Sequence, residues 1–167
     1  VTVQSCMNKG TVFTVDIPAA CVPDDGSPSS AYTGIKPPSD YSILTGRHIL
    51  VCEDHPLNQE IAQALLEEKG MIADIAENGQ TGVDKFRRSQ LWFYDAILMD
   101  IRMPVMDGYE AAESIRALDR EDAKTVPIIA MTADAFTGDI EKCRAAGMNG
   151  HIAKPIATDE LYILLSS

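Results

Sequence analysis

Acidic residues follow two of the short apolar runs in this sequence, as Glu53-Asp54 and as Asp100. Two further runs are followed by a hydroxyl group, Thr132, and by an ammonium group, Lys154. Neighbouring carboxylates repel each other, at a cost on the order of 4 kcal/mol for charges about 4 Å apart near a protein surface. A bound cation removes this repulsion, and oxygen ligands from separate loops suit Mg²⁺ better than Ca²⁺. Together with Mg²⁺, the four groups suit the making and breaking of an aspartyl phosphate.

The elements that must position these residues are strands and helices in alternation. From Arg47 onward the sequence reads as a strand followed by a helix, five times over. This alternation predicts a parallel sheet with right-handed crossovers, helices on both faces and a site at the carboxyl edge of the strands. The expected strands are 48–52, 71–76, a run ending at 100, 127–131 and 150–153, and the expected helices are 57–70, 79–88, 109–118, 140–146 and 158–167.

Asp100 is the residue on which this interpretation depends. The apolar run before it is short and bounded by polar residues, which suits a strand buried on both faces. Because an ionised carboxylate does not belong inside such a strand, we expect Asp100 at its carboxyl end. Taken alone, Asp100 is equally consistent with an ordinary turn residue after a strand. The case for a site therefore comes from four strand ends that carry chemistry together.

Composition narrows the classes of partner. The chain has 167 residues and a formal charge of −11, which disfavours nucleic acid and anionic membranes as ligands. No apolar run approaches the length that crosses a membrane. The four cysteines show no C-x-x-C spacing, so reduced thiols and a cytoplasmic location are expected. The parent protein could still be membrane-anchored through a sensor region outside this sequence.

The amino-terminal part has a different character. Residues 1–5 and 11–17 alternate and are β-branched, with a turn between them, which predicts a hairpin. An isolated hairpin is marginally stable, so we expect residues 1–18 to be the end of a larger domain; a disordered terminus is the alternative. Residues 19–45 are rich in Pro, Ser, Gly and Asp and read as a linker, and residues 46–167 form the α/β domain.

Four motifs resemble the receiver domain of two-component response regulators. They are ILVCEDHPLNQ at 49–59, ILMDIRMPVMDG at 97–108, PIIAMTA at 127–133 and AKP at 153–155. The resemblance implies a flavodoxin-like (βα)5 fold with a parallel sheet of strand order 2-1-3-4-5. A shorter motif, KGTVFTVDIP at 9–18, resembles the last strands of a histidine kinase ATP-binding domain. This order of domains resembles a hybrid sensor histidine kinase.

The resemblance also implies a role for each site residue. Asp100 would be the phosphoacceptor, and Thr132 and Lys154 would hold the phosphoryl group. Mg²⁺, or Mn²⁺ in its place, would bind Glu53 or Asp54, Asp100 and the backbone carbonyl of Arg102. The family usually joins its lysine to the following proline by a cis peptide bond, so Lys154-Pro155 is expected to be cis.

Two further expectations concern switching and phosphate lifetime. His151 stands at a position that is usually aromatic in the family, and we expect it to turn inward when Thr132 moves toward the phosphoryl group. A static surface histidine is the alternative. Arg102 and Asp134 stand where the family tunes access of hydrolytic water. Our hypothesis is that they pair across the mouth of the pocket, the alternative being two independent solvated side chains.

Phosphate is expected to come from a phosphohistidine, on a histidine kinase dimerisation domain or a histidine phosphotransfer protein. The sequence lacks nucleotide-binding motifs, so we expect only self-catalysed aspartyl phosphorylation and dephosphorylation in this chain, whereas the parent would be an ATP-dependent kinase. A degenerate receiver that acts only as a binding module is the alternative. An aspartate-nucleophile phosphatase is disfavoured because Arg102 replaces its second aspartate. Trp92 and Phe93 are expected to pack, and His55 to have a structural role in its loop.

Overall fold

The computed structural model describes residues 2–6, 10–14, 41–133 and 137–166, and divides the chain into units 1–35 and 36–167. In the first unit, β1 (Thr2–Cys6) and β2 (Gly10–Thr14) form an antiparallel pair. This confirms the predicted hairpin over its described residues. Residues 15–40, which hold the predicted end of the second strand and most of the linker, lie outside the described part. The assignment of the hairpin to a kinase domain stays a prediction.

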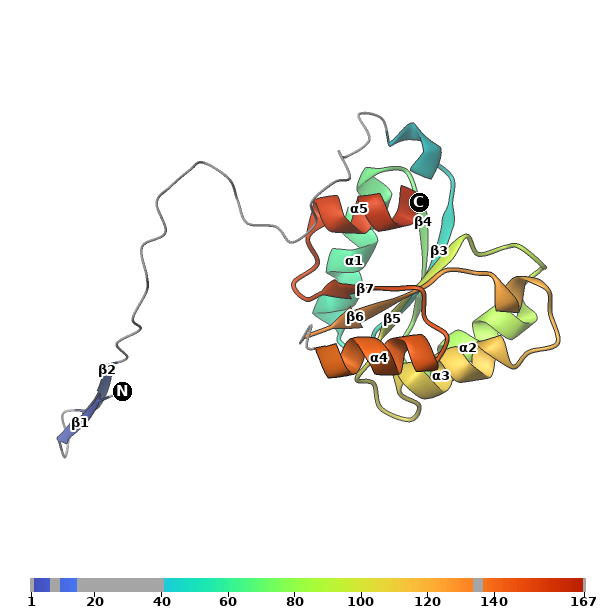
Figure 1. The fold of residues 1–167 in the computed structure, drawn as a ribbon. Coiled ribbons are helices and arrows are strands. Elements are labelled where there is room, and N and C mark those ends of the chain that lie inside the picture. The colour runs from blue at the N-terminus through green and yellow to red at the C-terminus, as the bar shows by residue number, and fades with distance from the viewer. Residues whose placement is uncertain (1, 7–9, 15–40, 134–136, 167) are drawn as a thin grey trace. The chain divides into compact units, whose positions relative to one another are not determined.

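The second unit is built on a five-stranded sheet of order β4-β3-β5-β6-β7 (Figure 1). All four pairings are parallel. Numbered within the domain, this is the order 2-1-3-4-5, so the expected fold class is confirmed. The strands are β3 (His48–Cys52), β4 (Ile72–Ala76), β5 (Ala96–Asp100), β6 (Ile128–Thr132) and β7 (Gly150–Ala153).

Helices cover both faces of this sheet, as expected. In Figure 1, α1 and α5 lie on one face and α2, α3 and α4 on the other. Each predicted helix is present, with bounds that differ by a few residues at most. The helices are α1 (Pro56–Glu68), α2 (Gly79–Arg88), α3 (Gly108–Arg116), α4 (Thr137–Ala145) and α5 (Thr158–Ser166), with short 3-10 helices η1 (Ser42–Leu44) and η2 (Asp122–Lys124).

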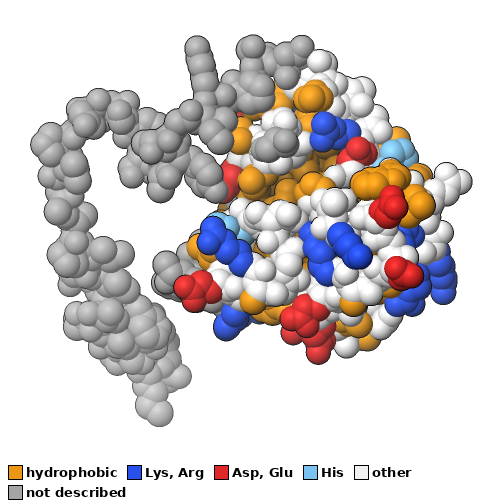
Figure 2. Space-filling model, turned by 45° about the vertical axis from the view of Figure 1, so that its right-hand side comes forward, with side chains coloured by type: hydrophobic (Ala, Val, Ile, Leu, Met, Phe, Trp, Pro, Cys, Tyr) orange, Lys and Arg blue, Asp and Glu red, His pale blue; other side chains and the backbone are white. Residues whose placement is uncertain are grey.

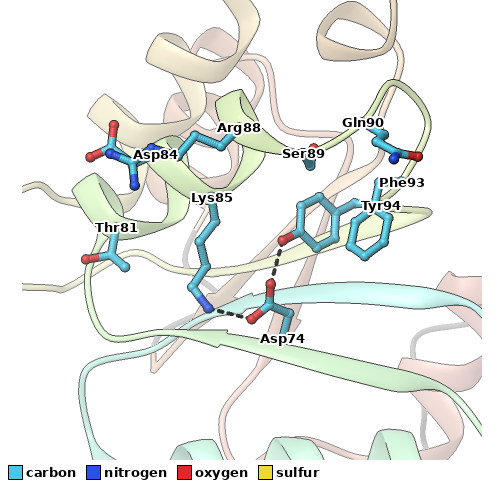
Figure 3. Close-up of a pocket in the computed structure, with 9 residues that line it drawn as sticks. All are labelled: Asp74, Thr81, Asp84, Lys85, Arg88, Ser89, Gln90, Phe93 and Tyr94. Atoms are coloured by element: carbon cyan, nitrogen blue, oxygen red, sulfur yellow. Dashed lines mark hydrogen bonds and ion pairs between the residues drawn. The ribbon is translucent and has the colours of Figure 1, made fainter.

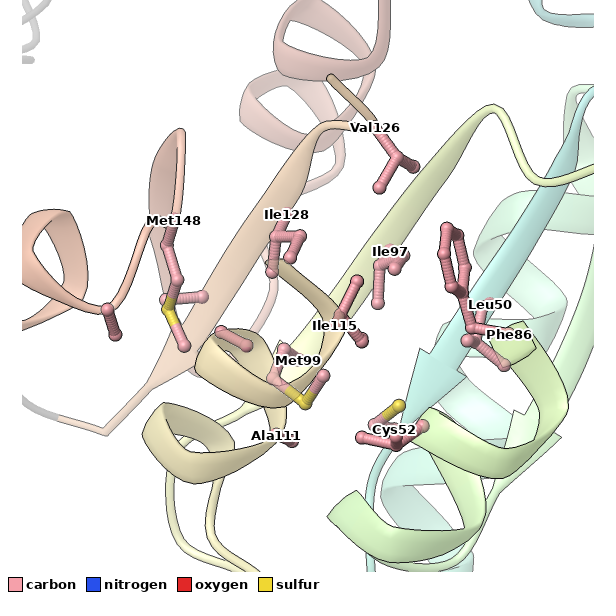
Figure 4. Packing of buried hydrophobic residues seen from close by; sticks show 14 of the residues in the cluster. Leu50, Cys52, Phe86, Ile97, Met99, Ala111, Ile115, Val126, Ile128 and Met148 are labelled. Atoms are coloured by element: carbon pink, nitrogen blue, oxygen red, sulfur yellow. The ribbon is translucent and has the colours of Figure 1, made fainter. Parts of the chain in front are cut away.

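The core has two layers, one on each face of the sheet. Figure 4 shows the layer under α2 and α3, where strand residues such as Leu50 and Ile97 meet Phe86 of α2. The thiol of Cys52 belongs to this layer and packs so closely on Gly82 that a β-carbon at that position would collide with the sulfur. Burial raises the pKa of the Cys52 thiol to about 12.

The spacing of Leu57, Ile61 and Leu65 predicts an apolar stripe along helix α1, but the helix turns a different row of residues to the core. Ala62 and Leu66 are buried, whereas Leu57 and Ile61 are 57% and 45% exposed. The reason is that residues one position apart lie about 100° apart around a helix, so a neighbouring row of residues faces the sheet. Leu65 is partly buried against the core, so only the first two residues of the stripe lie at the surface.

The expectation that Trp92 and Phe93 pack is wrong for Trp92, whose side chain is 60% exposed. Phe93 is 39% exposed and contacts the rings of His48 and Tyr94. Figure 2 shows apolar side chains reaching the surface among charged ones. The sequence around Trp92 and Phe93 does not predict their exposure, because contacts with residues distant in sequence position this loop.

An ion pair between Arg120 and Asp122 positions this loop. Asp122 is 2% exposed and accepts hydrogen bonds from the Arg120 guanidinium, at 2.7 Å from Nη2, and from the backbone N–H of Trp92 at 2.9 Å. Arg120 also donates to backbone carbonyls at the end of α2 and beyond it, where the last carbonyls of a helix lack intrahelical partners. The carbonyls belong to Phe86, Arg87, Ser89 and Gln90.

We expect Asp122→Asn to lower the free energy of unfolding by about 3 kcal/mol at pH 7, because it leaves the buried guanidinium side of the pair uncompensated. The hydrogen bond from Arg120 holds the pKa of Asp122 below its usual 3.8. Its stabilising contribution is thus complete above pH 3.8 and is lost as the pH falls through the lowered pKa. Urea unfolding of both proteins between pH 7 and pH 3 measures this; a constant difference at all pH values would contradict it.

Candidate functional site

The carboxyl edge of the sheet brings the predicted site residues together from four loops. Asp100 ends β5 and Thr132 ends β6, and both are buried. Glu53 follows β3, and Lys154 follows β7. A cavity of about 130 Å³ opens at this edge, and it is lined by Asp100, Ile101, Arg102, Thr132, Ala133 and Lys154.

Lys154 connects the two buried carboxylates of the site. Its Nζ lies 2.7 Å from Oδ2 of Asp100 and 2.5 Å from Oε2 of Glu53. Glu53 is 1% exposed and Asp100 6% exposed. One ammonium group therefore balances two acids that would otherwise repel each other in a poorly hydrated place.

Glu53 is held in place by the first turns of α1. Its Oε1 accepts hydrogen bonds from Nδ2 of Asn58 at 2.9 Å and from the backbone N–H of His55 at 3.2 Å. Gln59 donates from Nε2 to the Glu53 carbonyl at 2.6 Å. Sequence reasoning gave no role to Asn58 or Gln59. The signal was available, because side chains of a helix lean toward its amino terminus and thus toward residues just before it.

Three carboxylates form a group that could hold a metal ion. One oxygen each from Glu53, Asp54 and Asp100 lies within 4.8 Å of the others, and Asp54 is exposed to solvent. An all-oxygen set with an open side fits a hard divalent cation that keeps several waters. Arg102 contributes its backbone N–H, which donates to Oδ1 of Asp100 at 3.2 Å.

The pKa values of Asp100 and Lys154 are set by burial and by the contact between the two groups. Burial raises the pKa of Asp100, and the negative charge of Glu53 adds to the rise, while hydrogen bonds from Lys154 and Arg102 oppose it. Burial works to lower the pKa of Lys154, but its hydrogen bonds to Asp100 and Glu53 outweigh that and leave the pKa above its usual 10.5. Lys154 is therefore a cation at neutral pH.

Gly108 allows helix α3 to begin directly against the end of β5. A β-carbon at position 108 would collide with the backbone carbonyl of Asp100. Asp107 and Glu110 form a reciprocal cap at this helix start, since Glu110 N–H donates to Asp107 Oδ1 at 2.9 Å. This close join fixes the loop that carries Arg102.

The remaining expectations have different outcomes. The peptide bond between Lys154 and Pro155 is cis, as expected. His151 lies in β7 beside Ala130, with a partly exposed side chain, and its switching role stays a prediction. Asp134 lies outside the described residues, so its pairing with Arg102 also stays a prediction. Within the described residues, no helix has the length and apolar character needed to cross a membrane.

An α/β sheet of order 2-1-3-4-5 with an acidic group, a hydroxyl and a lysine at its carboxyl edge defines a receiver-type domain. Comparison with known families agrees: residues 49–166 match the response regulator receiver domain. The chain belongs to this family.

Relatives with this domain include hybrid kinases. The chain is 37% identical over 128 residues to hybrid signal transduction histidine kinase I of Dictyostelium discoideum. This alignment covers 75% of the chain and 7% of that protein. It is 35% identical over 123 residues to the peroxide stress-activated histidine kinase mak1 of Schizosaccharomyces pombe, covering 73% of the chain and 8% of that protein. The chain thus spans under a tenth of the length of these two relatives.

Two solved structures are informative neighbours. The receiver domain of a sensor histidine kinase from Pseudomonas aeruginosa, with a magnesium ion coordinated in its active-site cleft, is 44% identical and has a TM-score of 0.65. The alignment covers 73% of this chain and 96% of that one. The Saccharomyces cerevisiae receiver domain of Ssk1, crystallised with the histidine phosphotransfer protein Ypd1, is 27% identical with a TM-score of 0.62, and covers 70% and 84% of the two chains.

Proposed function

We propose that residues 46–167 form a Mg²⁺-dependent phosphoacceptor in a phosphorelay, with Asp100 receiving the phosphoryl group. The observation that carries this proposal is the buried Asp100 carboxylate, which faces a small cavity while Lys154 contacts it at 2.7 Å. The group Glu53, Asp54 and Asp100 supports a cation at the same place. Membership of the receiver family supports a shared role for these groups in phosphoryl transfer.

In the proposed reaction, a carboxylate oxygen of Asp100 attacks the phosphorus of a phosphohistidine. The new P–O bond forms as the P–N bond breaks, and the imidazole leaves with the electron pair and takes up a proton. Lys154 and the hydroxyl of Thr132 would hold the phosphoryl oxygens. Mg²⁺, or Mn²⁺, would be held by Glu53 or Asp54, by Asp100 and by the Arg102 carbonyl, and would supply positive charge against the transferred oxygens.

The product would be an acyl phosphate that is passed on or hydrolysed. On this proposal, Thr132 and His151 report the phosphoryl group to the face formed by α4 and α5, and Arg102 with Asp134 limits hydrolysis. Residues 1–18 would be the end of a kinase ATP-binding domain and 19–45 a linker, in a cytoplasmic part of a longer hybrid kinase. The kinship to hybrid kinases supports this arrangement.

A histidine phosphotransfer protein or a kinase dimerisation domain is the partner we propose. The neighbour crystallised with Ypd1 supports the first of these. An apolar surface suited to a protein partner lies beside the site, because the exposed Ile61 and the site residues Glu53 and Lys154 line one small pocket. Leu57 extends this surface by one turn of α1. Apolar anchors beside a reacting group are typical of a docking surface.

We expect Ile61→Asp to slow phosphoryl transfer from phosphorylated Ypd1 by about tenfold or more, because a buried apolar anchor typically contributes more than 1 kcal/mol to binding. Phosphorylation by a small donor such as acetyl phosphate should slow far less than transfer from Ypd1, since the substitution removes no group of the site. Ile72→Asp is the matched control, because Ile72 is 49% exposed on β4. Equal transfer rates in the two variants would reject the α1 surface as the docking site.

The experiment that tests the function is phosphorylation by acetyl phosphate followed by intact mass measurement. With Mg²⁺ we expect the chain to gain one phosphoryl group, which hydroxylamine removes because an acyl phosphate is labile to it. A chelator should suppress the gain. A chain that gains no phosphoryl group with Mg²⁺ but still binds Ypd1 would identify the alternative, a receiver that acts only as a binding module.

A further inference from the structure

Three consecutive apolar side chains are exposed in the loop between α2 and β5. Leu91, Trp92 and Phe93 are 56%, 60% and 39% exposed. Trp92 has a positive φ of 63°, a conformation that costs energy for a bulky residue, and the buried Asp122 carboxylate holds its backbone N–H. The loop is thus fixed in a conformation that displays apolar surface to solvent. Such a display marks an interaction surface.

A groove runs from this loop along α2. It has a volume of about 650 Å³ and is lined by Asp74, Thr81, Asp84, Lys85, Arg88, Ser89, Gln90, Phe93 and Tyr94 (Figure 3). From Thr81 to Arg88 the helix advances roughly 10 Å at 1.5 Å per residue, which matches about three residues of an extended peptide. On its other side the groove is bounded by β4, which is an edge strand of the described sheet. None of these residues lines the Asp100 cavity.

One positively charged side chain of this groove has no ion-pair partner among the described residues. Asp74 is occupied by Lys85 at 2.5 Å and by the hydroxyl of Tyr94 at 2.5 Å, as Figure 3 shows. Asp84 is paired with Arg87 at 3.0 Å. Arg88 is exposed and forms no ion pair with any residue of the described part. A guanidinium presents a fixed fork of donors that suits a carboxylate.

We propose that this groove, together with the exposed residues Leu91 and Trp92 beside Phe93 at its end, binds an extended acidic peptide segment of a partner protein. A carboxylate of the segment pairs with Arg88, and an apolar side chain packs against Leu91, Trp92 and Phe93. The chain's net charge of −11 repels extended polyanions such as nucleic acid or an anionic membrane. A carboxylate that is flanked by apolar side chains fits the groove better. Binding here is independent of the phosphoacceptor chemistry, because the groove and the Asp100 cavity share no lining residue.

Trp92 is the single tryptophan of the chain and is adjacent in sequence to Phe93, which lines the groove, so its fluorescence reports on binding at this end of the groove. The full chain is titrated with an acetylated and amidated nine-residue peptide that carries one central glutamate among alternating leucine and serine, and with a counterpart that has lysine in place of the glutamate. We expect a saturable blue shift with the acidic peptide alone. Arg88→Ala should raise its Kd by about tenfold or more, since charge-assisted hydrogen bonds are lost. Arg144→Ala, which removes an exposed charge from α4, is the matched control and should leave the Kd unchanged.

Three results would overturn the proposal: no saturable shift with the acidic peptide, equal binding of the lysine peptide, or an unchanged Kd in Arg88→Ala. Sedimentation of the chain alone provides a further test. A dimer that Trp92→Ala dissociates would assign the surface to a second copy of the chain instead. Phosphoryl uptake is measured on the same samples and is expected to be equal in Arg88→Ala and wild type, so a failure at one site is separable from a failure at the other.

Discussion

Asp100→Asn is expected to take up no phosphoryl group from acetyl phosphate, under conditions in which the unmodified chain is fully phosphorylated. The amide of asparagine keeps the size of the side chain and can still accept the hydrogen bond that the backbone N–H of Arg102 donates to Oδ1 at 3.2 Å. Asparagine lacks the nucleophilic carboxylate, so the variant should lose phosphoryl uptake and keep its fold. Intact mass after incubation with Mg²⁺ measures it.

The same variant should be at least as stable as wild type without metal. Burial raises the pKa of Asp100, so ionising this group costs the folded state more than the unfolded state. That cost is absent below the unfolded pKa of 3.8, grows as the pH rises above 3.8 and is complete once the pH has passed the raised pKa. Urea unfolding in chelator should therefore show a difference in favour of Asp100→Asn at pH 7 that vanishes at low pH.

Two results would contradict this account. Asp119→Asn, an exposed carboxylate in the loop after α3, is the control and should be phosphorylated normally. Phosphoryl uptake by Asp100→Asn equal to that of the control would place the acceptor elsewhere. A variant that is markedly less stable at pH 7 than at low pH, relative to wild type, would mean that the buried carboxylate is stabilising.

Lys154→Ala is expected to lower the free energy of unfolding by about 3 to 5 kcal/mol in chelator, because it leaves two buried carboxylates without their counter-charge. Glu53 and Asp100 are 1% and 6% exposed, so water compensates poorly. The raised pKa of Lys154 means that its contribution is fully present below pH 10.5 and is lost as the pH rises above the raised value. Chemical denaturation at pH 7 and above pH 10.5 measures this.

Mg²⁺ should restore much of this loss, because a ligand that binds only the folded state adds about 2.7 kcal/mol at a concentration of 100 times Kd. The stabilisation by Mg²⁺ should be larger in Lys154→Ala than in wild type, where the ammonium already balances the acids. Lys85→Ala is the matched control: its ion pair with Asp74 is more than a third exposed on both sides, so its loss should cost less than about 1 kcal/mol. Equal losses in the two variants would show that burial of the pair is unimportant.

The fold and the centre of the site could be predicted because their signals are local. Each strand is a short apolar run, and the polar residue that follows or ends it marks the carboxyl edge, so the pattern predicts Glu53, Asp100, Thr132 and Lys154 at one edge. The strand bounds moved by one residue: β4 begins at Ile72 and β6 extends to Thr132. These shifts leave the order of the sheet unchanged.

The features that escaped prediction depend on contacts distant in sequence. Arg120 reaches carbonyls more than 30 positions away, at Phe86 and Ser89, and nothing near it in the chain indicates this. The exposure of Leu57 and Ile61 follows from which face of α1 packs on the sheet, and periodicity gives a face without giving its direction. Function at surfaces was therefore less visible from sequence than function at strand ends.

The packing of Cys52 against Gly82 has a consequence for experiments on this protein. A thiol with a pKa near 12 carries almost no thiolate at neutral pH, and alkylating reagents react with the thiolate. Alkylation of Cys52 thus requires the layer under α2 to open, so its rate under native conditions measures how often that happens. The alkylation rate of Cys52 therefore compares how often the domain opens with and without phosphate on Asp100.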